Sequence, residues 1–78
     1  MILYYFEACP FCQKVLKMID ELGISDRIDF RDTSEFPTFR EELIKLNGRT
    51  QVPCLVVDGK PMLESDDIVI FLRKNFGS

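Results

Sequence analysis

Two cysteines, Cys9 and Cys12, lie between an apolar run and a stretch with helical periodicity, and this arrangement constrains the fold more than any other feature. The run Met-Ile-Leu-Tyr-Tyr-Phe at residues 1–6 is rich in β-formers and predicts a buried strand. Pro10 suits the first turn of a helix, where its missing N–H is not required. Gly23 suits the C-cap position at which the helix would end. The apolar stripe between them is Val15, Leu16, Met18, Ile19 and Leu22. The sequence therefore predicts a strand, a short loop and a helix that starts at the two thiols.

The position of these thiols favours sulfur chemistry. A thiol at a helix N-terminus meets unpaired backbone N–H groups and the positive end of the helix dipole, and both favour the nucleophilic thiolate. Cys9 holds that position, whereas we expect Cys12, one turn later, to be more buried and less acidic. The pattern predicts a redox dithiol in which Cys9 attacks and Cys12 resolves. The alternatives are two buried thiols or half of a metal site, but a second pair of zinc ligands is missing.

The composition predicts one domain, residues 1–78, in a reducing compartment. Three cysteines and no histidine argue against a disulfide scaffold and against a four-ligand zinc site, so no metal is expected. A net charge of −3 with scattered Lys and Arg argues against nucleic-acid binding. No membrane-spanning run or signal peptide is evident, so a cytoplasmic location is expected. Without an imidazole, a reactive thiol must be activated by dipoles, hydrogen bonds or basic side chains.

The middle of the chain predicts a second strand and a second helix. Residues 27–32 alternate charged and apolar side chains, as in a half-exposed strand. Thr33 or Ser34 is expected to cap the second helix, with Pro37 in its first turn. Asn47 and the glycine after it are expected to end this helix. The expected inner face of this helix is Phe39, Leu43 and Leu46.

The last third of the chain predicts a hairpin and a helix. Residues 54–57 form a short apolar strand, Asp58-Gly59 is a two-residue hairpin signal, and residues 60–63 return. Ser65 is expected to be the N-cap of the last helix. The order is βαβαββα, with the first two strands parallel and the last two antiparallel. We therefore expect an α/β, thioredoxin-like fold: a four-stranded mixed sheet covered by three helices.

Pro53 stands directly before the strand at residues 54–57, after Val52. A proline here either starts a strand or forms a cis bond that leaves the backbone of Val52 free for an extended, peptide-like ligand. The expected fold favours the second interpretation. Phe11, between the cysteines, is expected on the rim of the site, where it shapes ligand access. We expect Cys54 to be a buried structural thiol.

The last helix begins with Glu64, Ser65 and Asp66. Helix capping is one interpretation of this run. The other, compatible with it, is that backbone N–H groups bind a ligand carboxylate while an acidic side chain pairs with a ligand ammonium. Arg49 is either solvated or holds a ligand carboxylate near the cysteines, and the same alternatives stay open for Lys14.

In this order and spacing, the motifs resemble those of the glutaredoxin family over nearly the whole chain. The resemblance rests on Cys-Pro-Phe-Cys, on Gly-Arg-Thr-Gln-Val-Pro at residues 48–53, and on Asp-Gly at residues 58–59 followed by Ser-Asp-Asp-Ile at residues 65–68. It implies a monomeric, glutathione-dependent thiol–disulfide oxidoreductase acting on disulfide-containing or glutathionylated proteins, with glutathione as co-substrate. Cys9 would form the mixed disulfide with glutathione, and Cys12 would resolve protein disulfides.

The resemblance also implies a glutathione groove. Val52, before a cis Pro53, would pair with the cysteinyl part of glutathione, and Ser65 with Asp66 would hold its γ-glutamyl end. Many glutaredoxins carry a lysine where this chain has Phe6, so the partner of the glycyl carboxylate is open. Arg49 is the first substitute to test.

The chain departs from most glutaredoxins in a second place. The pair Glu64-Ser65 and the opening segment resemble those of glutathione transferases. The chain is therefore similar to a transferase-related glutaredoxin without the helical second domain of those enzymes, and conjugation is not expected. Two alternatives are an iron–sulfur cluster carrier, with the cluster held by Cys9 and glutathione between two chains, and a thioredoxin-type electron donor that ignores glutathione.

Overall fold

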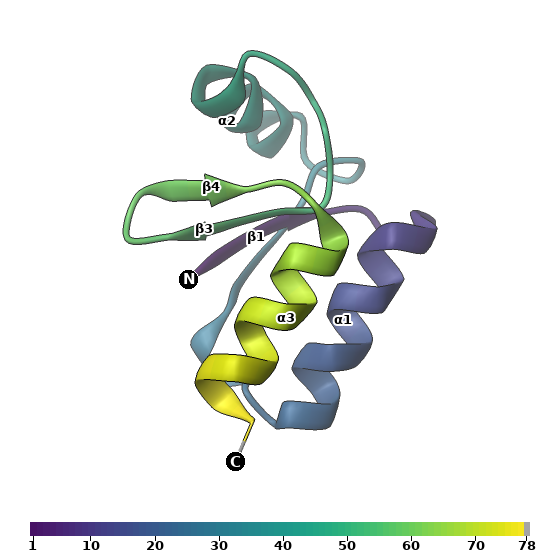
Figure 1. The fold of residues 1–78 in the computed structure, drawn as a ribbon. Helices are drawn as coiled ribbons and strands as arrows, with labels where there is room; N and C mark the ends of the chain where they lie inside the picture. Colours follow the sequence, from purple (N-terminus) through teal and green to yellow (C-terminus); the bar gives the residue numbers. More distant parts are fainter. Residues whose placement is uncertain (78) are drawn as a thin grey trace.

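A four-stranded sheet separates helices α1 and α3 on one face from helix α2 on the other (Figure 1). This computed structural model describes residues 1–77. The elements are β1 (Ile2–Tyr5), α1 (Pro10–Leu22), the 3₁₀ turn η1 (Ser25–Arg27), β2 (Asp29–Asp32), α2 (Pro37–Asn47), β3 (Cys54–Val57), β4 (Lys60–Met62) and α3 (Ser65–Phe76). The expected α/β, thioredoxin-like fold and its βαβαββα order are confirmed.

The strand order is β2-β1-β3-β4. β1 runs parallel to β2 and antiparallel to β3, so Leu3 lies between Phe30 and Leu55. β4 is an outer strand, and its Pro61 pairs with Val56. An outer position suits proline because the missing N–H leaves no gap inside the sheet.

The core lies on both faces of the sheet. The larger cluster fills the space between the sheet and the pair α1 and α3; its fully buried members are Leu3, Val15, Ile19, Leu55, Ile68 and Leu72. The smaller cluster lies under α2 and consists of Tyr4, Leu43, Cys54 and Val56. Because β1 and β3 are central, their alternate side chains supply both clusters.

Local chemistry explains several element boundaries. Pro10 is the first residue of α1, and Gly23 ends this helix in the left-handed conformation with φ 66°. The hairpin residues Asp58 and Gly59 both have positive φ, 51° and 79°, as expected for the tight turn that matches strand twist. Within residues 1–77, no helix has both the length and the apolar character needed to cross a bilayer.

The expected cap of α2 is wrong. Phe36, not Thr33 or Ser34, holds the N-cap position, and no side chain among residues 1–77 caps it. The Asp32 carboxylate instead accepts hydrogen bonds from the backbone N–H of Ser34 at 2.9 Å and from that of Glu35 at 3.1 Å. These bonds form a turn that ends before the helix begins.

Two further expectations need correction. Ser65 is the first residue of α3 rather than its N-cap, a position that Glu64 holds without a capping side-chain hydrogen bond within residues 1–77. In α2 Leu43 is fully buried, but Leu46 is exposed, because it borders a hollow between α2 and the sheet that it shares with Tyr4 and Val56.

Candidate active site

The dithiol lies where β1 leads into α1. Cys9 is the N-cap residue of α1, and its Sγ accepts a hydrogen bond from the backbone N–H of Cys12 at 3.4 Å. The backbone N–H of Cys9 donates to the carbonyl of Phe6 at 3.2 Å, which fixes the loop between strand and helix. Sulfur thus takes the role that an oxygen takes in most N-caps. A backbone N–H directed at a sulfur stabilises negative charge on it.

Cys12 has different surroundings. Its side chain is fully buried in the first turn of α1. Loss of solvation is the main reason that the pKa of the Cys12 thiol is raised to about 12, and the neighbouring Cys9 adds to the effect. Both residues are free thiols, as is Cys54. The structure therefore places a helix-capping thiol next to a thiol that favours its neutral form.

Cys54 is a buried thiol in β3, as expected. Burial raises its pKa, and the side-chain amide of Asn47 opposes this by donating to Sγ at 3.4 Å. The preceding bond, Val52–Pro53, is cis, in agreement with the interpretation favoured from the sequence. Among residues 1–77, no group of three or more Cys, Asp or Glu side chains is arranged to hold a metal ion.

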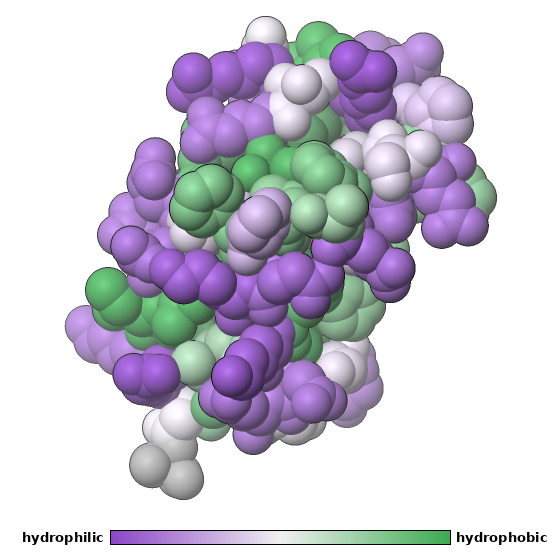
Figure 2. All heavy atoms as spheres, turned by 90° about the vertical axis from the view of Figure 1, so that its right-hand side faces the viewer, coloured by the Kyte–Doolittle hydropathy of each residue, from purple (hydrophilic) through white to green (hydrophobic). Residues whose placement is uncertain are grey.

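A groove of about 340 Å³ reaches Phe11, the residue directly before Cys12, although neither Cys9 nor Cys12 lines it. Its walls come from α1, from the loop before β3, and from the segment between β4 and α3. The lining residues are Phe11, Lys14, Gln51, Val52, Pro53, Leu63, Glu64, Ser65 and Asp66. On the side of the molecule that carries α1, hydrophobic side chains gather in a patch bordered by hydrophilic ones (Figure 2).

This groove brings together most of the residues that the sequence singled out. Six of the seven proposed ligand-binding residues line it: Phe11, Val52, Pro53, Glu64, Ser65 and Asp66. Arg49 is exposed and is absent from the lining. Lys14, left open by the sequence, does line it, as do Gln51 and Leu63, which the sequence analysis missed. Gln51 stands inside the motif at residues 48–53 and Leu63 directly precedes Glu64, so proximity to motif residues was the available signal.

A second hollow, of about 210 Å³, reaches the same loop from the side of Phe6. It is lined by Phe6, Thr33, Ser34, Arg40 and Thr50. Sequence reasoning missed Arg40, since no local motif distinguishes it from the other basic residues of α2. Only the fold brings Arg40 to a hollow that it shares with Thr33, Ser34 and Thr50.

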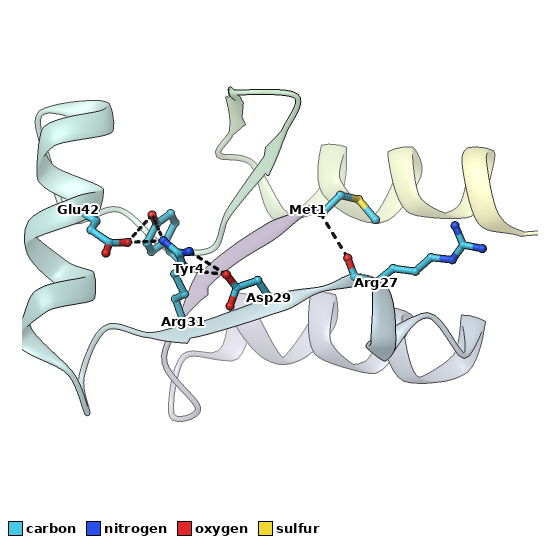
Figure 3. Close-up of polar contacts among 6 residues, drawn as sticks. All are labelled: Met1, Tyr4, Arg27, Asp29, Arg31 and Glu42. Carbon is cyan, nitrogen blue, oxygen red and sulfur yellow. Dashed lines mark hydrogen bonds and ion pairs between the residues drawn. The ribbon is translucent and has the colours of Figure 1, made fainter.

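A cluster of polar side chains lies away from the dithiol and ties α2 to the sheet (Figure 3). Arg31 on β2 donates to Asp29 at 2.8 Å and also to Glu42 on α2. The Tyr4 hydroxyl on β1 donates to the same Glu42 carboxylate at 2.9 Å. Burial, followed by this bond to Glu42, raises the pKa of Tyr4. The cluster supports the helix that carries Arg40.

Fold and site together define the class: a thioredoxin-fold protein with two cysteines at the start of its first helix. The family model "Glutathione S-transferase, N-terminal domain" matches residues 3–78. Glutaredoxin 3 of Escherichia coli (strain K12) is 32% identical over 69 residues, which is 85% of this chain and 77% of that relative. The chain therefore belongs to the family that joins glutaredoxins with the N-terminal domains of glutathione S-transferases.

Solved transferase structures share the fold. Glutathione S-transferase 1-6 from Anopheles dirus species B superimposes with a TM-score of 0.81 and 32% identity, covering 100% of this chain and 37% of its own. Glutathione S-transferase unclassified 2 from Bombyx mori gives a TM-score of 0.84 and 25% identity, with 99% and 36% covered. The chain thus spans little more than a third of the length of these transferases.

Proposed function

We propose that this protein is a glutathione-dependent thiol–disulfide oxidoreductase that reduces glutathione mixed disulfides and protein disulfides. The observation that carries the proposal is the Cys9 sulfur, which caps α1 and accepts the N–H of Cys12 beside a groove of peptide size. The named relatives, a glutaredoxin and glutathione S-transferases, support glutathione as the co-substrate.

In this proposal the groove holds the cysteinyl and γ-glutamyl parts of glutathione. The backbone of Val52 pairs with the cysteinyl part, and Phe11 covers it from the other side. The γ-glutamyl carboxylate lies at the start of α3, where Glu64 occupies the N-cap position without a capping side-chain bond among the described residues. Unpaired N–H groups at a helix N-terminus are a favourable site for an anion. The carboxylates of Glu64 and Asp66 attract the γ-glutamyl ammonium.

The glycyl carboxylate needs a cation at the other end, where Phe6 stands in the place of the family's lysine. We assign this role to Arg40, because it lines the hollow beside Phe6 together with Thr33 and Thr50. Arg49, the first candidate from the sequence, lines neither the hollow nor the groove. It is the second residue to test.

The one-thiol route uses Cys9 alone. The Cys9 thiolate attacks the glutathione sulfur of a mixed disulfide, a bond forms between the two sulfurs, and the substrate leaves as a thiolate that takes up a proton. A second glutathione, as thiolate, then attacks the glutathione sulfur bound to Cys9. Oxidised glutathione leaves and the Cys9 thiolate is restored.

The two-thiol route adds Cys12. Cys9 attacks a protein disulfide and releases one substrate thiolate, and Cys12 then attacks the Cys9 sulfur to release the other. Because Cys12 favours its neutral form, the departing substrate thiolate or solvent must first take its proton. Two glutathione molecules reduce the resulting Cys9–Cys12 disulfide, and each supplies one electron.

The test is turnover of a glutathione mixed disulfide, coupled to glutathione reductase and NADPH. We expect Cys9→Ser to abolish turnover, whereas Cys12→Ser retains removal of glutathione and loses reduction of protein disulfides. Cys54→Ala is the matched control, a thiol removed outside the site, and is expected to stay active. An inactive wild type, or undiminished turnover in Cys9→Ser, would show that the proposal is wrong.

A further inference from the structure

The groove contains an ion pair that joins two of its walls. The Nζ atom of Lys14, on α1, lies 3.0 Å from Oδ1 of Asp66 in the first turn of α3. Both residues line the groove. Their side chains are 56% and 78% exposed, and exposed pairs of this kind contribute little to stability. A charged ligand can therefore replace either partner at small cost.

The charges in the groove are unequal. Among the lining residues that the structure describes, Lys14 is the one cation, whereas Glu64 and Asp66 are carboxylates. A ligand that brings a lone carboxylate must separate Lys14 from Asp66 and leaves the Asp66 carboxylate without its partner. A ligand that brings a lone ammonium likewise releases Lys14. A ligand with both charges on one carbon satisfies both residues.

We propose that Lys14 and Asp66 form an exchangeable ion pair that selects ligands ending in a free α-amino acid. When such a ligand binds, its ammonium replaces Lys14 beside Asp66, and the ammonium of Lys14 pairs with the ligand's α-carboxylate. Two ion pairs then stand where one stood, and the net charge of the groove and its ligand is unchanged. This inference rests on the proposed function and names Lys14 as the residue that determines ligand specificity.

The positions of the two residues suit this role. Lys14 is in the second turn of α1, and Asp66 is in the first turn of α3. The two helices pack side by side against the sheet (Figure 1), so both charges stand on rigid elements. The same helix that carries the capping sulfur of Cys9 carries Lys14. A ligand joined to Cys9 through its thiol therefore meets Lys14 at a set distance along its own chain.

The experiment is titration calorimetry on the reduced full chain with three ligands that cannot exchange disulfides. They are S-methylglutathione, its analogue without the α-carboxylate and its analogue without the α-ammonium. We expect wild type to prefer S-methylglutathione to both analogues. Lys14→Met should weaken S-methylglutathione about fivefold, as for the loss of one exposed ion pair, and should not weaken the analogue that lacks the carboxylate.

The matched control is Lys17→Met, an exposed lysine of the same helix that does not line the groove. It should leave all three affinities unchanged, and Lys14→Arg should retain the preference of wild type. An equal loss of affinity for all three ligands in the Lys14→Met variant would show that Lys14 only shapes the groove. Tighter binding of S-methylglutathione by that variant would show that Lys14 only obstructs the groove. Either result overturns the exchange and leaves the proposed function standing, whereas a wild type that binds none of the ligands overturns both.

Discussion

Cys9 and Cys12 are three positions apart and both are buried, yet they differ: Cys9 remains 6% exposed and Cys12 is fully buried. Cys9 stands before the first helical residue and accepts an N–H, whereas Cys12 stands inside the turn and is cut off from solvent. Attack requires a thiolate, and resolution requires that the second thiol wait until the first has reacted. The difference between the two positions provides that order.

At this scale we predict that a thiol-alkylating reagent labels the folded protein once. Near neutral pH, iodoacetamide should modify Cys9 and spare Cys12, because burial raises the pKa of Cys12 to about 12 and little thiolate is present below that pH. Cys54 should also be spared, since burial raises its pKa too. Peptide mass spectrometry locates the label. Modification of Cys12 in the folded protein should become appreciable only as the pH approaches about 12.

Unfolding in urea is the control for this prediction, because all three thiols then meet water and should be labelled at similar rates. Cys9→Ser should take up no label while folded. Labelling of Cys12 as fast as Cys9 near neutral pH would contradict the difference in environment that the two-thiol route requires.

At the scale of elements, α2 is attached to the rest of the molecule by few buried contacts. Leu43 is the one fully buried residue of α2. Polar contacts with the sheet therefore provide much of the interaction that holds this helix in place. Arg31 provides these contacts: it bonds Glu42 on α2, bonds Tyr4 on β1, and lies over the ring of Phe39 at 5.6 Å. The helix that carries Arg40 thus depends on one guanidinium of β2.

We therefore predict that Arg31→Leu lowers the free energy of unfolding by about 1 kcal/mol, the usual worth of a charged hydrogen bond reduced for partial exposure. Urea unfolding measures this change. Lys45→Met, which alters an exposed charge of the same helix, should change stability by less than about half that amount. Equal stabilities of the two variants would show that the cluster does not hold α2.

Boundaries that depend on one or two residues were predictable from the sequence. Pro10 and Gly23 set the ends of α1 because each restricts or permits one backbone conformation, and no distant residue competes. The start of α2 was not predictable in the same way. Ser34 is a good cap in isolation, but the Asp32 carboxylate accepts both its N–H and its hydroxyl, so Ser34 stays in the preceding turn.

The same distinction applies to the site. Phe11, Val52 and Asp66 belong to short motifs, and the groove lined by all three was predictable from those motifs. Arg40 and the Lys14–Asp66 pair were not, since they depend on which faces of α1, α2 and α3 meet. Sequence separation explains this: Lys14 and Asp66 are 52 positions apart in the chain.

For the whole molecule, the absence of histidine determines how stability responds to pH. No side chain of the 78-residue sequence has an ordinary pKa between 5 and 8. The shifted pKa values of Asp32, Cys12 and Cys54 also lie outside the range from 5 to 8. Partial burial acts to raise the pKa of Asp32, but hydrogen bonds from Ser34 and Glu35 outweigh it and lower the pKa. Burial raises the pKa of the Cys12 and Cys54 thiols.

These pKa shifts set an acid limit and an alkaline limit to the pH range in which the protein is most stable. Asp32, with its pKa lowered on folding, stabilises the protein above pH 3.8, and this contribution is lost as the pH falls through the folded value. Cys12 contributes fully below pH 9, and its contribution is lost as the pH rises toward about 12. We predict an unfolding free energy that is constant within about 0.5 kcal/mol from pH 5.5 to 8 and falls on both sides.

Urea unfolding across this pH range tests the prediction, and two variants separate the limits. Cys12→Ala removes the buried ionisable thiol, so its stability should fall less steeply than that of wild type above pH 9, even if its stability near neutral pH is lower. Asp32→Asn should reduce the loss on the acid side, because the amide cannot be protonated there. A marked change in wild-type stability between pH 6 and 8 would contradict the prediction for this histidine-free chain.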